Sequence, residues 1–431
     1  MNNQDIIEYI RQGSVPLQTM ADLQPLVDAI GDARFVLLGE ASHGTSEFYT
    51  WRIELSKLLI AQKGFHFVAV EGDWPSCYYM NRYVKQYEDA LQTPHEVMAQ
   101  FNRWPTWMWA NQEILQWIEW LRADNSKKSS HEKVGFYGLD MYSLWESMEE
   151  VIRHLKALDA PEDQIALAER AFSCFEPYGN DGQQYGFRAW SEDADCAEEV
   201  VQLLKGMQRQ RHTEANEADD ESSFSNELNA LVAVNAERYY RSMIRGGPDS
   251  WNIRDRHMTE ALQKLTDFHG HGEGGKAIVW EHNTHIGDAR ATDMAEDGMV
   301  NVGQLVRELY GSDQVFAVGF GSYEGTVIAA NAWAAPTQTM QVPQAIRNSW
   351  EYLFHEASAS DQLIIFDKDT DILMDNRGHR AIGVVYHPRN ERGNYVPTML
   401  SSRYDAFIYL DQTHALQPLV FREHEPMPMI P

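Results

Sequence analysis

The sequence predicts an α/β protein built on a mostly parallel sheet, with a helical insertion. Short, continuous apolar runs recur along the chain, segments with helical periodicity separate them, and four of the runs end on an acid. With 431 residues, 43% of them hydrophobic, the chain is long enough for a large core and two or three structural units. We predict the first part of the α/β core at 1–142, a helical insertion and candidate lid at 143–246, and the second part of the core at 247–431.

A β-α-β unit is expected near the start of the chain. Apolar spacing predicts a helix over 17–31, and the apolar run at 34–38 predicts a strand that is covered on both faces. Thr45 or Ser46 can cap the helix that follows, and 65–70 forms the next strand. A right-handed crossover makes the two strands parallel, so the residues that follow them share one edge of the sheet.

The remaining elements follow from the same patterns. Residues 74–125 are aromatic-rich and helical in pattern, and 143–246 are helical in pattern and strongly acidic. Further strands are expected at 133–140, 276–281, 314–320, 362–366, 382–386 and 404–410. Because helices interrupt the sheet, its functional edge must be assembled from residues that lie far apart in sequence.

Tryptophan is concentrated in one part of the chain, since six of the thirteen lie between Trp74 and Trp120. Aromatic side chains such as Trp74, Trp104 and Trp107 are candidates to line a partly apolar pocket and contact a substrate. Ordinary packing of a two-helix layer explains the same residues equally well.

Acids and histidines gather where the apolar runs end. In open α/β sheets, ligands bind at the carboxyl ends of the strands. If the runs are parallel strands, that edge carries Glu40, His43, Glu71, Asp140, Glu281, His282 and His285.

Two residues near the first strand are candidates for chemistry. His43 follows Glu40 by three residues on a glycine-flanked turn. Neighbouring carboxylates can tune the pKa of an imidazole to near neutral pH, which suits a general base. A lone histidine in a loop is nevertheless more often incidental. Arg52 falls near the start of the next helix, where its guanidinium could pair with Glu40 or Glu71 or hold an anionic intermediate. Spacing alone favours a surface arginine.

His282 and His285 stand three residues apart directly after an expected strand. This spacing suits either metal ligation together with a glutamate or stabilisation of an oxyanion. The sequence HNTH is not the HExxH zinc signature, so we predict no metal and no cofactor. A hydrolase that binds magnesium or manganese through the same glutamates and histidines is the alternative.

Several classes of protein are disfavoured. The chain has no GxSxG elbow, no GxxxxGK[ST] loop and no GxGxxG after a strand, which leaves an edge suited to activating water. A formal charge of −28 disfavours nucleic acids and anionic membranes as partners. Cys77, Cys174 and Cys196 are too few and scattered for a disulfide framework. Without a signal-peptide profile or a membrane-spanning segment, the sequence predicts a cytoplasmic protein. It does not determine the oligomeric state.

The chain resembles the erythromycin esterase family in segments spread over nearly its whole length. They are LLGEASHGTSEFYTWR at 37–52, VAVEGDWPSCYYMNRYV at 68–84, FYGLDMYSLWESM at 136–148, RDRHM at 254–258, WEHNTHIGDAR at 280–290 and GVVYHPRNERGNY at 383–395. The segment GEASHGTSEF is a specific signature of this resemblance.

The resemblance implies a three-layer α/β/α core with a helical insertion and, within 247–431, a smaller α/β piece. It also implies a hydrolase that opens carboxylic esters with activated water and without a covalent serine intermediate. In the best-known members the ester is the macrolactone ring of erythromycin-type antibiotics, which implies a small-molecule substrate and a part in antibiotic resistance. His43 matches the general base, and the other matching site residues are Glu40, Arg52, Glu71, His282 and His285. Wider relatives of this fold resemble haem or ligand binders, and in that alternative His43 or His282 would contact the ligand.

Overall fold

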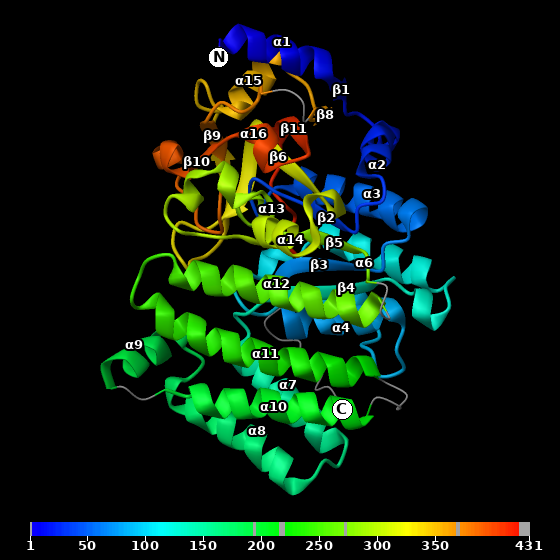
Figure 1. Cartoon of the computed structure of the whole chain (residues 1–431), viewed down its shortest axis with the longest axis vertical. Coiled ribbons are helices and arrows are strands. Elements are labelled where there is room, and N and C mark those ends of the chain that lie inside the picture. Colours follow the sequence, from blue (N-terminus) through cyan, green and yellow to red (C-terminus); the bar gives the residue numbers. More distant parts are fainter. Residues whose placement is uncertain (1, 193–194, 215–219, 271–273, 368–370, 422–431) are drawn as a thin grey trace. The chain divides into compact units, whose positions relative to one another are not determined.

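A computed structural model describes residues 2–192, 195–214, 220–270, 274–367 and 371–421. The chain combines a mostly parallel sheet with many helices (Figure 1), which confirms the predicted α/β class. The chain divides into two compact units. The first unit holds Met1–Ala69, Tyr79–Phe136 and Leu265–Pro431, and the second holds Val70–Tyr78 and Tyr137–Lys264. The divisions expected at 142 and 246 stay predictions.

The main sheet contains strands from both ends of the sequence. The strands are β1 (Ser14–Pro16), β2 (Phe35–Leu38), β3 (Phe67–Asp73), β4 (Gly135–Asp140), β5 (Ala277–Trp280), β6 (Val315–Ala329), β7 (Gln338–Val342), β8 (Gln362–Ile365), β9 (Arg377–Arg380), β10 (Tyr395–Thr398) and β11 (Ala406–Thr413). Within the described residues, nine strands form the main sheet in the order β1-β8-β11-β6-β2-β5-β3-β4, with β7 paired to β6. Strand β2 is parallel to β5 and β6, and β6 is parallel to β11. The pairs β1–β8, β8–β11 and β6–β7 are antiparallel. Strands β1, β8 and β11 stand at the beginning of this order.

Helices connect most of these strands. They are α1 (Asn3–Gly13), α2 (Gln24–Ile30), α3 (Ser46–Lys63), α4 (Trp74–Lys85), α5 (Pro94–Met98), α6 (Gln112–Asn125), α7 (Leu144–Ala157), α8 (Glu162–Phe175), α9 (Gly182–Glu192), α10 (Ala197–Glu214), α11 (Asp220–Met243), α12 (Asp249–Gly270), α13 (Asn283–Ile286), α14 (Val302–Tyr310), α15 (Trp350–Ala357) and α16 (Leu400–Arg403). In the first unit, α3 packs against α6, and α14 and α15 pack against β6. No helix of the described chain combines the length and the apolar character needed to cross a bilayer.

The first β-α-β unit forms where the sequence predicts it. All four residues of β2 are buried, as expected for a strand covered on both faces. Thr45 is the N-cap of α3, and Gly64 ends the helix in the left-handed region at φ 68°. Strand β3 is longer than the expected 65–70, so Glu71 lies within the strand and not beyond its end.

Several element boundaries differ from the prediction. The helix expected over 17–31 is a 3-10 turn at Met20–Leu23 followed by α2, with a proline in the first turn of α2. The strand expected at 314–320 continues to Ala329. The strand expected at 382–386 is wrong, because this segment forms only isolated bridges of Ile382 with Ser42 and of Val385 with Ala330. Apolar periodicity does not distinguish such bridges from a strand.

The second unit is built mainly from helices. Helices α7, α8, α10 and α11 pack on one another around two apolar clusters that include Trp145, Phe175 and Leu203. Cys174 and Cys196 form a disulfide across 22 residues of sequence. The cysteines that are too few and scattered for a disulfide framework thus include one bonded pair, because the fold brings the end of α8 to the residue before α10. Cys77 is the free cysteine and is buried.

Candidate active site

The turn after β2 is held by close backbone contacts at two glycines. A Cβ atom at Gly39 would lie 2.0 Å from Asn283 Oδ1, and one at Gly44 would lie 2.0 Å from Ile328 O. The N–H of Ile328 donates to Gly44 O at 3.0 Å, and the Tyr49 hydroxyl donates to His43 O at 3.0 Å. The turn that carries Glu40 and His43 therefore has a fixed course between β6 and α3.

Glu40 lies between an imidazole and a guanidinium. Its Oε1 is 2.8 Å from His43 Nδ1, and its Oε2 is 2.6 Å from Arg52 Nη2. The side chains of Glu40 and Arg52 are 3% and 1% exposed, and the side chain of His43 is 9% exposed. Arg52 also lies over the rings of Tyr49 and Trp280, at 4.4 and 5.2 Å. Arg52 is thus a buried anchor for Glu40 and not the surface arginine that spacing alone favours.

This geometry selects the tautomer of His43. A carboxylate only accepts hydrogen bonds, so the contact with Glu40 places the imidazole proton on Nδ1. The second nitrogen, Nε2, then carries the lone pair that can take a proton from water. The pair arises from a spacing of three residues within one turn, which the sequence shows directly.

His282 lies beside His43. Their ring centroids are 4.9 Å apart and their planes are inclined by 46°. The backbone N–H of Thr284 donates to His282 Nδ1 at 3.3 Å, and the Thr284 hydroxyl lies 2.8 Å from the same nitrogen. In neutral His282 the proton is therefore on Nε2, so one histidine presents a lone pair and the other an N–H donor.

The two histidine turns are joined by backbone contacts. The N–H of Asn283 donates to Glu40 O at 2.9 Å, and the N–H of His285 donates to His282 O at 2.8 Å. Asn283 and His285 both lie in α13 and are 0% and 2% exposed. Glu281, which precedes this turn, is fully buried. Glu40, His43, Arg52, His282 and His285 therefore all belong to the packed interior of the first unit.

A second ionic cluster occupies the second unit. Arg254 Nη2 lies 2.7 Å from Glu71 Oε1 and 2.6 Å from Asp140 Oδ2, and Arg254 Nε lies 3.0 Å from Asp140 Oδ1. Burial raises the pKa of Asp140, but Arg254 outweighs burial and the net shift is downward. Two of the predicted edge acids, Glu71 and Asp140, are thus paired with an arginine that was not among the candidates.

The family of this chain is known from its similarity to other proteins. The family model described as erythromycin esterase matches residues 60–413. The chain belongs to the erythromycin esterase family. The match includes Glu71, His282 and His285 and begins after Glu40, His43 and Arg52.

One curated protein and two solved structures are similar to this chain. An Escherichia coli protein named erythromycin esterase type II is 25% identical over 345 residues, which are 75% of this chain and 78% of that protein. A crystal structure of a succinoglycan biosynthesis protein has a TM-score of 0.75 at 21% identity and covers 96% of this chain and 98% of that one. A mutant of the erythromycin esterase EreC in its open conformation has a TM-score of 0.63 at 16% identity, with 94% and 96% covered. The two structures show that the fold is shared.

The three tryptophans predicted to contact substrate differ in burial. Trp74 and Trp107 are 1% and 2% exposed, and the Trp74 indole N–H donates to Ser225 Oγ at 3.1 Å. Their burial favours the packing alternative for these two members of the set. Trp104 is partly exposed and its ring lies 4.7 Å from the ring of Trp333, which is 59% exposed. Trp104 remains the candidate for substrate contact in this member of the family.

Sequence reasoning missed Arg254 and Asn283 as site residues. Arg254 opens the RDRHM segment that carries part of the resemblance to the erythromycin esterase family, so its signal was present without a role attached. Asn283 stands between His282 and the second histidine of HNTH, where histidines draw attention to metal or oxyanion chemistry. Its several backbone contacts come from residues far away in sequence and have no local signature.

Proposed function

We propose that this protein hydrolyses a carboxylic ester of a small molecule with water that His43 activates as general base. The observation that carries the proposal is the imidazole of His43, held through Nδ1 by the Arg52-anchored Glu40 so that Nε2 is the basic nitrogen. Membership of the erythromycin esterase family supports a hydrolase.

The proposed steps balance as follows. Nε2 of His43 takes a proton from water while the oxygen attacks the ester carbonyl carbon and forms a tetrahedral oxyanion. The Nε2–H of His282 donates to that oxyanion, which its tautomer and the 4.9 Å ring separation support. The intermediate then expels the alkoxide, which takes the proton from His43, and a carboxylic acid and an alcohol result. Arg52, with Nη2 on Glu40, acts here by holding Glu40 and not as the oxyanion donor.

The family name and the E. coli relative's name favour a macrolactone as the ester, and resistance to such antibiotics would follow. Incubation with a 14-membered macrolide and, separately, with p-nitrophenyl esters tests this choice. Lactone opening adds the mass of one water to the macrolide, whereas release of nitrophenol reports general esterase activity. Hydrolysis of neither substrate class by folded protein would contradict the proposal.

We propose this reaction without a metal. Both oxygens of Glu40 already contact cationic or donor groups, and within the described ranges no three His, Cys, Asp or Glu side chains are grouped so that they could hold an ion. Magnesium and manganese sites are built from several oxygen ligands, and on these contacts we favour a reaction that uses neither ion. Chelator treatment followed by metal add-back separates the alternatives, because the proposed water reaction keeps its rate. The haem-binding alternative is tested by an absorption spectrum after haem addition. Cytoplasmic location is part of the proposal as well.

A further inference from the structure

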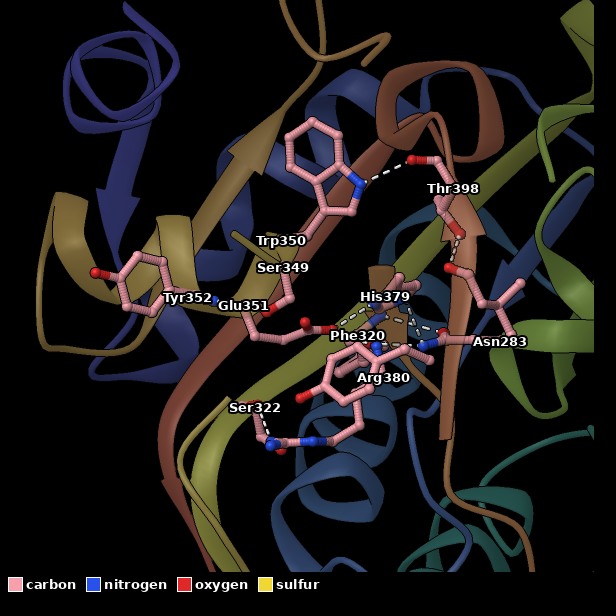
Figure 2. Close-up of polar contacts among 12 residues, drawn as sticks. Asn283, Phe320, Ser322, Ser349, Trp350, Glu351, Tyr352, His379, Arg380 and Thr398 are labelled. Carbon is pink, nitrogen blue, oxygen red and sulfur yellow. Dashed lines mark hydrogen bonds and ion pairs between the residues drawn. The ribbon is translucent and has the colours of Figure 1, made fainter. Parts of the chain in front are cut away.

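A buried polar chain links α15, β9 and the turn that carries His282 (Figure 2). Its members are Glu351, His379 and Asn283, which are 0%, 1% and 0% exposed. His379 Nδ1 lies 2.6 Å from Glu351 Oε1, and His379 Nε2 lies 3.1 Å from Asn283 Nδ2. The N–H of Arg380 donates to the same carboxylate oxygen of Glu351 at 2.7 Å.

The hydrogen-bonding capacity of this chain fits one protonation state. Asn283 Nδ2 donates to Phe320 O at 2.6 Å, and Asn283 Oδ1 accepts from Phe320 N at 3.2 Å. The second hydrogen on Nδ2 then points to His379 Nε2, which must carry a lone pair. The imidazole proton is therefore on Nδ1, where it meets the Glu351 carboxylate.

The pKa shifts agree with this state. Burial lowers the pKa of His379, so the imidazole is neutral at pH 7. Burial raises the pKa of Glu351, but the hydrogen bond from His379 together with the charge and the backbone N–H of Arg380 lower it, and the net shift is downward. A protonated His379 would turn an N–H toward the Asn283 amide hydrogens and break the chain.

Asn283 connects this polar chain to the turn that carries His43 and to the turn that carries His282. Its backbone N–H holds Glu40 O, and its backbone carbonyl accepts from Arg403 Nη2 at 2.9 Å. His282 precedes it directly in the sequence. A displacement of the Asn283 amide would therefore move His282 relative to His43 without altering either side chain.

We propose that Glu351, His379 and Asn283 are positioning residues that set the relative placement of His43 and His282. The inference rests on the proposed function and deepens it. An apolar trio could fill the same volume, and buried charged pairs are weak contributors to stability relative to such replacements. What the polar chain adds is a single orientation for the Asn283 amide.

The test compares His379→Leu with His379→Gln. Leucine removes the contact with Asn283, and glutamine restores a polar group in the region of Nε2. We expect kcat of His379→Leu to fall about 10- to 100-fold with little change in KM, since small misplacements of reacting groups have effects of this size. His379→Gln should recover part of the loss. The matched control is His355→Leu, because His355 lies on α15, as Glu351 does, and is likewise paired with a carboxylate, Asp411, at 2.7 Å.

A spectroscopic arm keeps this inference separate from the ester reaction. Labelled-histidine NMR reads the imidazoles of His43 and His282 without any substrate. We expect both sets of signals to shift in His379→Leu and to stay in place in His355→Leu. Unchanged His43 and His282 signals in folded His379→Leu would overturn the inference even if the wild-type protein hydrolyses esters. A shift in a protein that hydrolyses no ester would uphold the positioning role and refute the proposed reaction.

An independent observation concerns the turn between α11 and α12 in the second unit. A pocket of about 470 Å³ there has Ser242, Asn252 and Asp249 in its wall, together with Arg238, Arg241, Arg245 and Arg256. The segment 238–256 contains five arginines and two acids in a chain whose net charge is −28. The pocket is thus a cationic spot on a strongly acidic protein.

Three of these arginines have no carboxylate partner among the described residues. Arg241 is paired with Glu237 at 3.0 Å and with Asp195 at 3.0 Å. Within the part of the chain that the structure describes, Arg238, Arg245 and Arg256 have no acid at ion-pair distance, and all three are exposed. A favourable interaction with the carboxyl end of α11 accounts for cations at 238 and 241. It gives no reason for Arg256, which lies in α12.

We propose that this pocket binds a ligand that presents a multiply charged anionic group, either phosphate or carboxylate. Guanidinium groups match both, because their planar donors form paired hydrogen bonds with such oxygens. Ser242 and Asn252 add neutral polar groups to the pocket wall, and the single acid Asp249 leaves an excess of positive charge.

Calorimetric titration with inorganic pyrophosphate and, separately, with citrate tests the site at constant ionic strength. Binding of one and not the other identifies the phosphate or carboxylate source. We expect Arg238→Gln/Arg245→Gln to weaken binding at least about tenfold, which corresponds to the loss of a charge-assisted hydrogen bond. The matched control is Arg188→Gln, an exposed arginine of the same unit that pairs with Glu192. Absent binding of both probes, or equal binding by the double variant and the control, would overturn this proposal.

Discussion

The two ionic clusters of the molecule have opposite charge orders. In the first unit one carboxylate, Glu40, lies between His43 and Arg52. In the second unit one guanidinium, Arg254, lies between Glu71 and Asp140. Both clusters bury their charges at hydrogen-bond distance, yet only the first contains a group that can accept a proton near neutral pH.

We propose that this difference separates a cluster that takes part in chemistry from one that stabilises the structure, although the sequence predicts Glu71 of the second cluster as a site residue. An imidazole bound through one nitrogen keeps the other for reaction, whereas a guanidinium whose donors meet two carboxylates is chemically quiet. The carboxylates of the second cluster nevertheless lie on β3 and β4, two strands whose carboxyl ends the sequence predicts to carry functional residues. Substitutions in the first cluster should therefore lower activity, and substitutions in the second should lower stability.

The largest effect is expected from His43→Ala. Loss of the general base should reduce kcat about 10²- to 10⁴-fold, because that is the usual contribution of such a group. Steady-state kinetics with a p-nitrophenyl ester, together with circular dichroism to verify folding, measure the effect. His355→Leu is the control, since it removes a histidine–carboxylate pair elsewhere in the first unit. Retention of most activity by folded His43→Ala would falsify the assignment.

The first cluster shows which site residues the sequence can predict and which it cannot. Glu40 and His43 could be predicted because they stand three positions apart in one turn, and α3 was predictable because its cap and its ending glycine are local signals. Arg52 was uncertain because its partner depends on how α3 packs. The contact of His379 with Asn283 was beyond reach, since β9 has the polar sequence RGHR and its pairing is long-range. Physical proximity without a local pattern leaves no sequence signal.

Arg254→Met should break the second cluster. It leaves the carboxylates of Glu71 and Asp140 buried without a cation, and removal of one partner from a buried pair costs about 3–5 kcal/mol. Urea unfolding measures the loss, and Arg256→Met is the control because this neighbour is exposed. A much smaller loss would show that the cluster is not structural. A fall in kcat of the folded variant would instead give the second cluster a part in catalysis and erase the contrast.

Reduction of the Cys174–Cys196 disulfide tests whether the helical unit depends on its own constraints. A loop of 22 residues predicts a stabilisation of about 3 kcal/mol from the restricted unfolded chain. Amide exchange in α8 and α10, with and without a thiol reductant, reports the change. The Cys174→Ser/Cys196→Ser variant should exchange like the reduced protein and should not respond to the reductant. Equal protection in both redox states would show that helix packing alone secures this unit.

The smallest effect concerns His257, which is buried beside the second cluster with Nδ1 3.0 Å from Asn235 Nδ2. Burial lowers the pKa of His257 to about 4, although Asp140 opposes the shift. Because this pKa lies below the unfolded value of about 6.5, the unfolded chain takes up a proton first as pH falls. Stability is therefore complete above about pH 6.5 and declines toward pH 4, by about 2 kcal/mol between pH 7 and pH 5. Urea unfolding at these two pH values should show that difference in wild type and a smaller one in His257→Gln. His131→Gln, at an exposed position, should retain the wild-type difference. An equal change in unfolding free energy between the two pH values in all three proteins would assign the acid sensitivity to other groups. It would also show that His257 does not affect the stability of the second cluster.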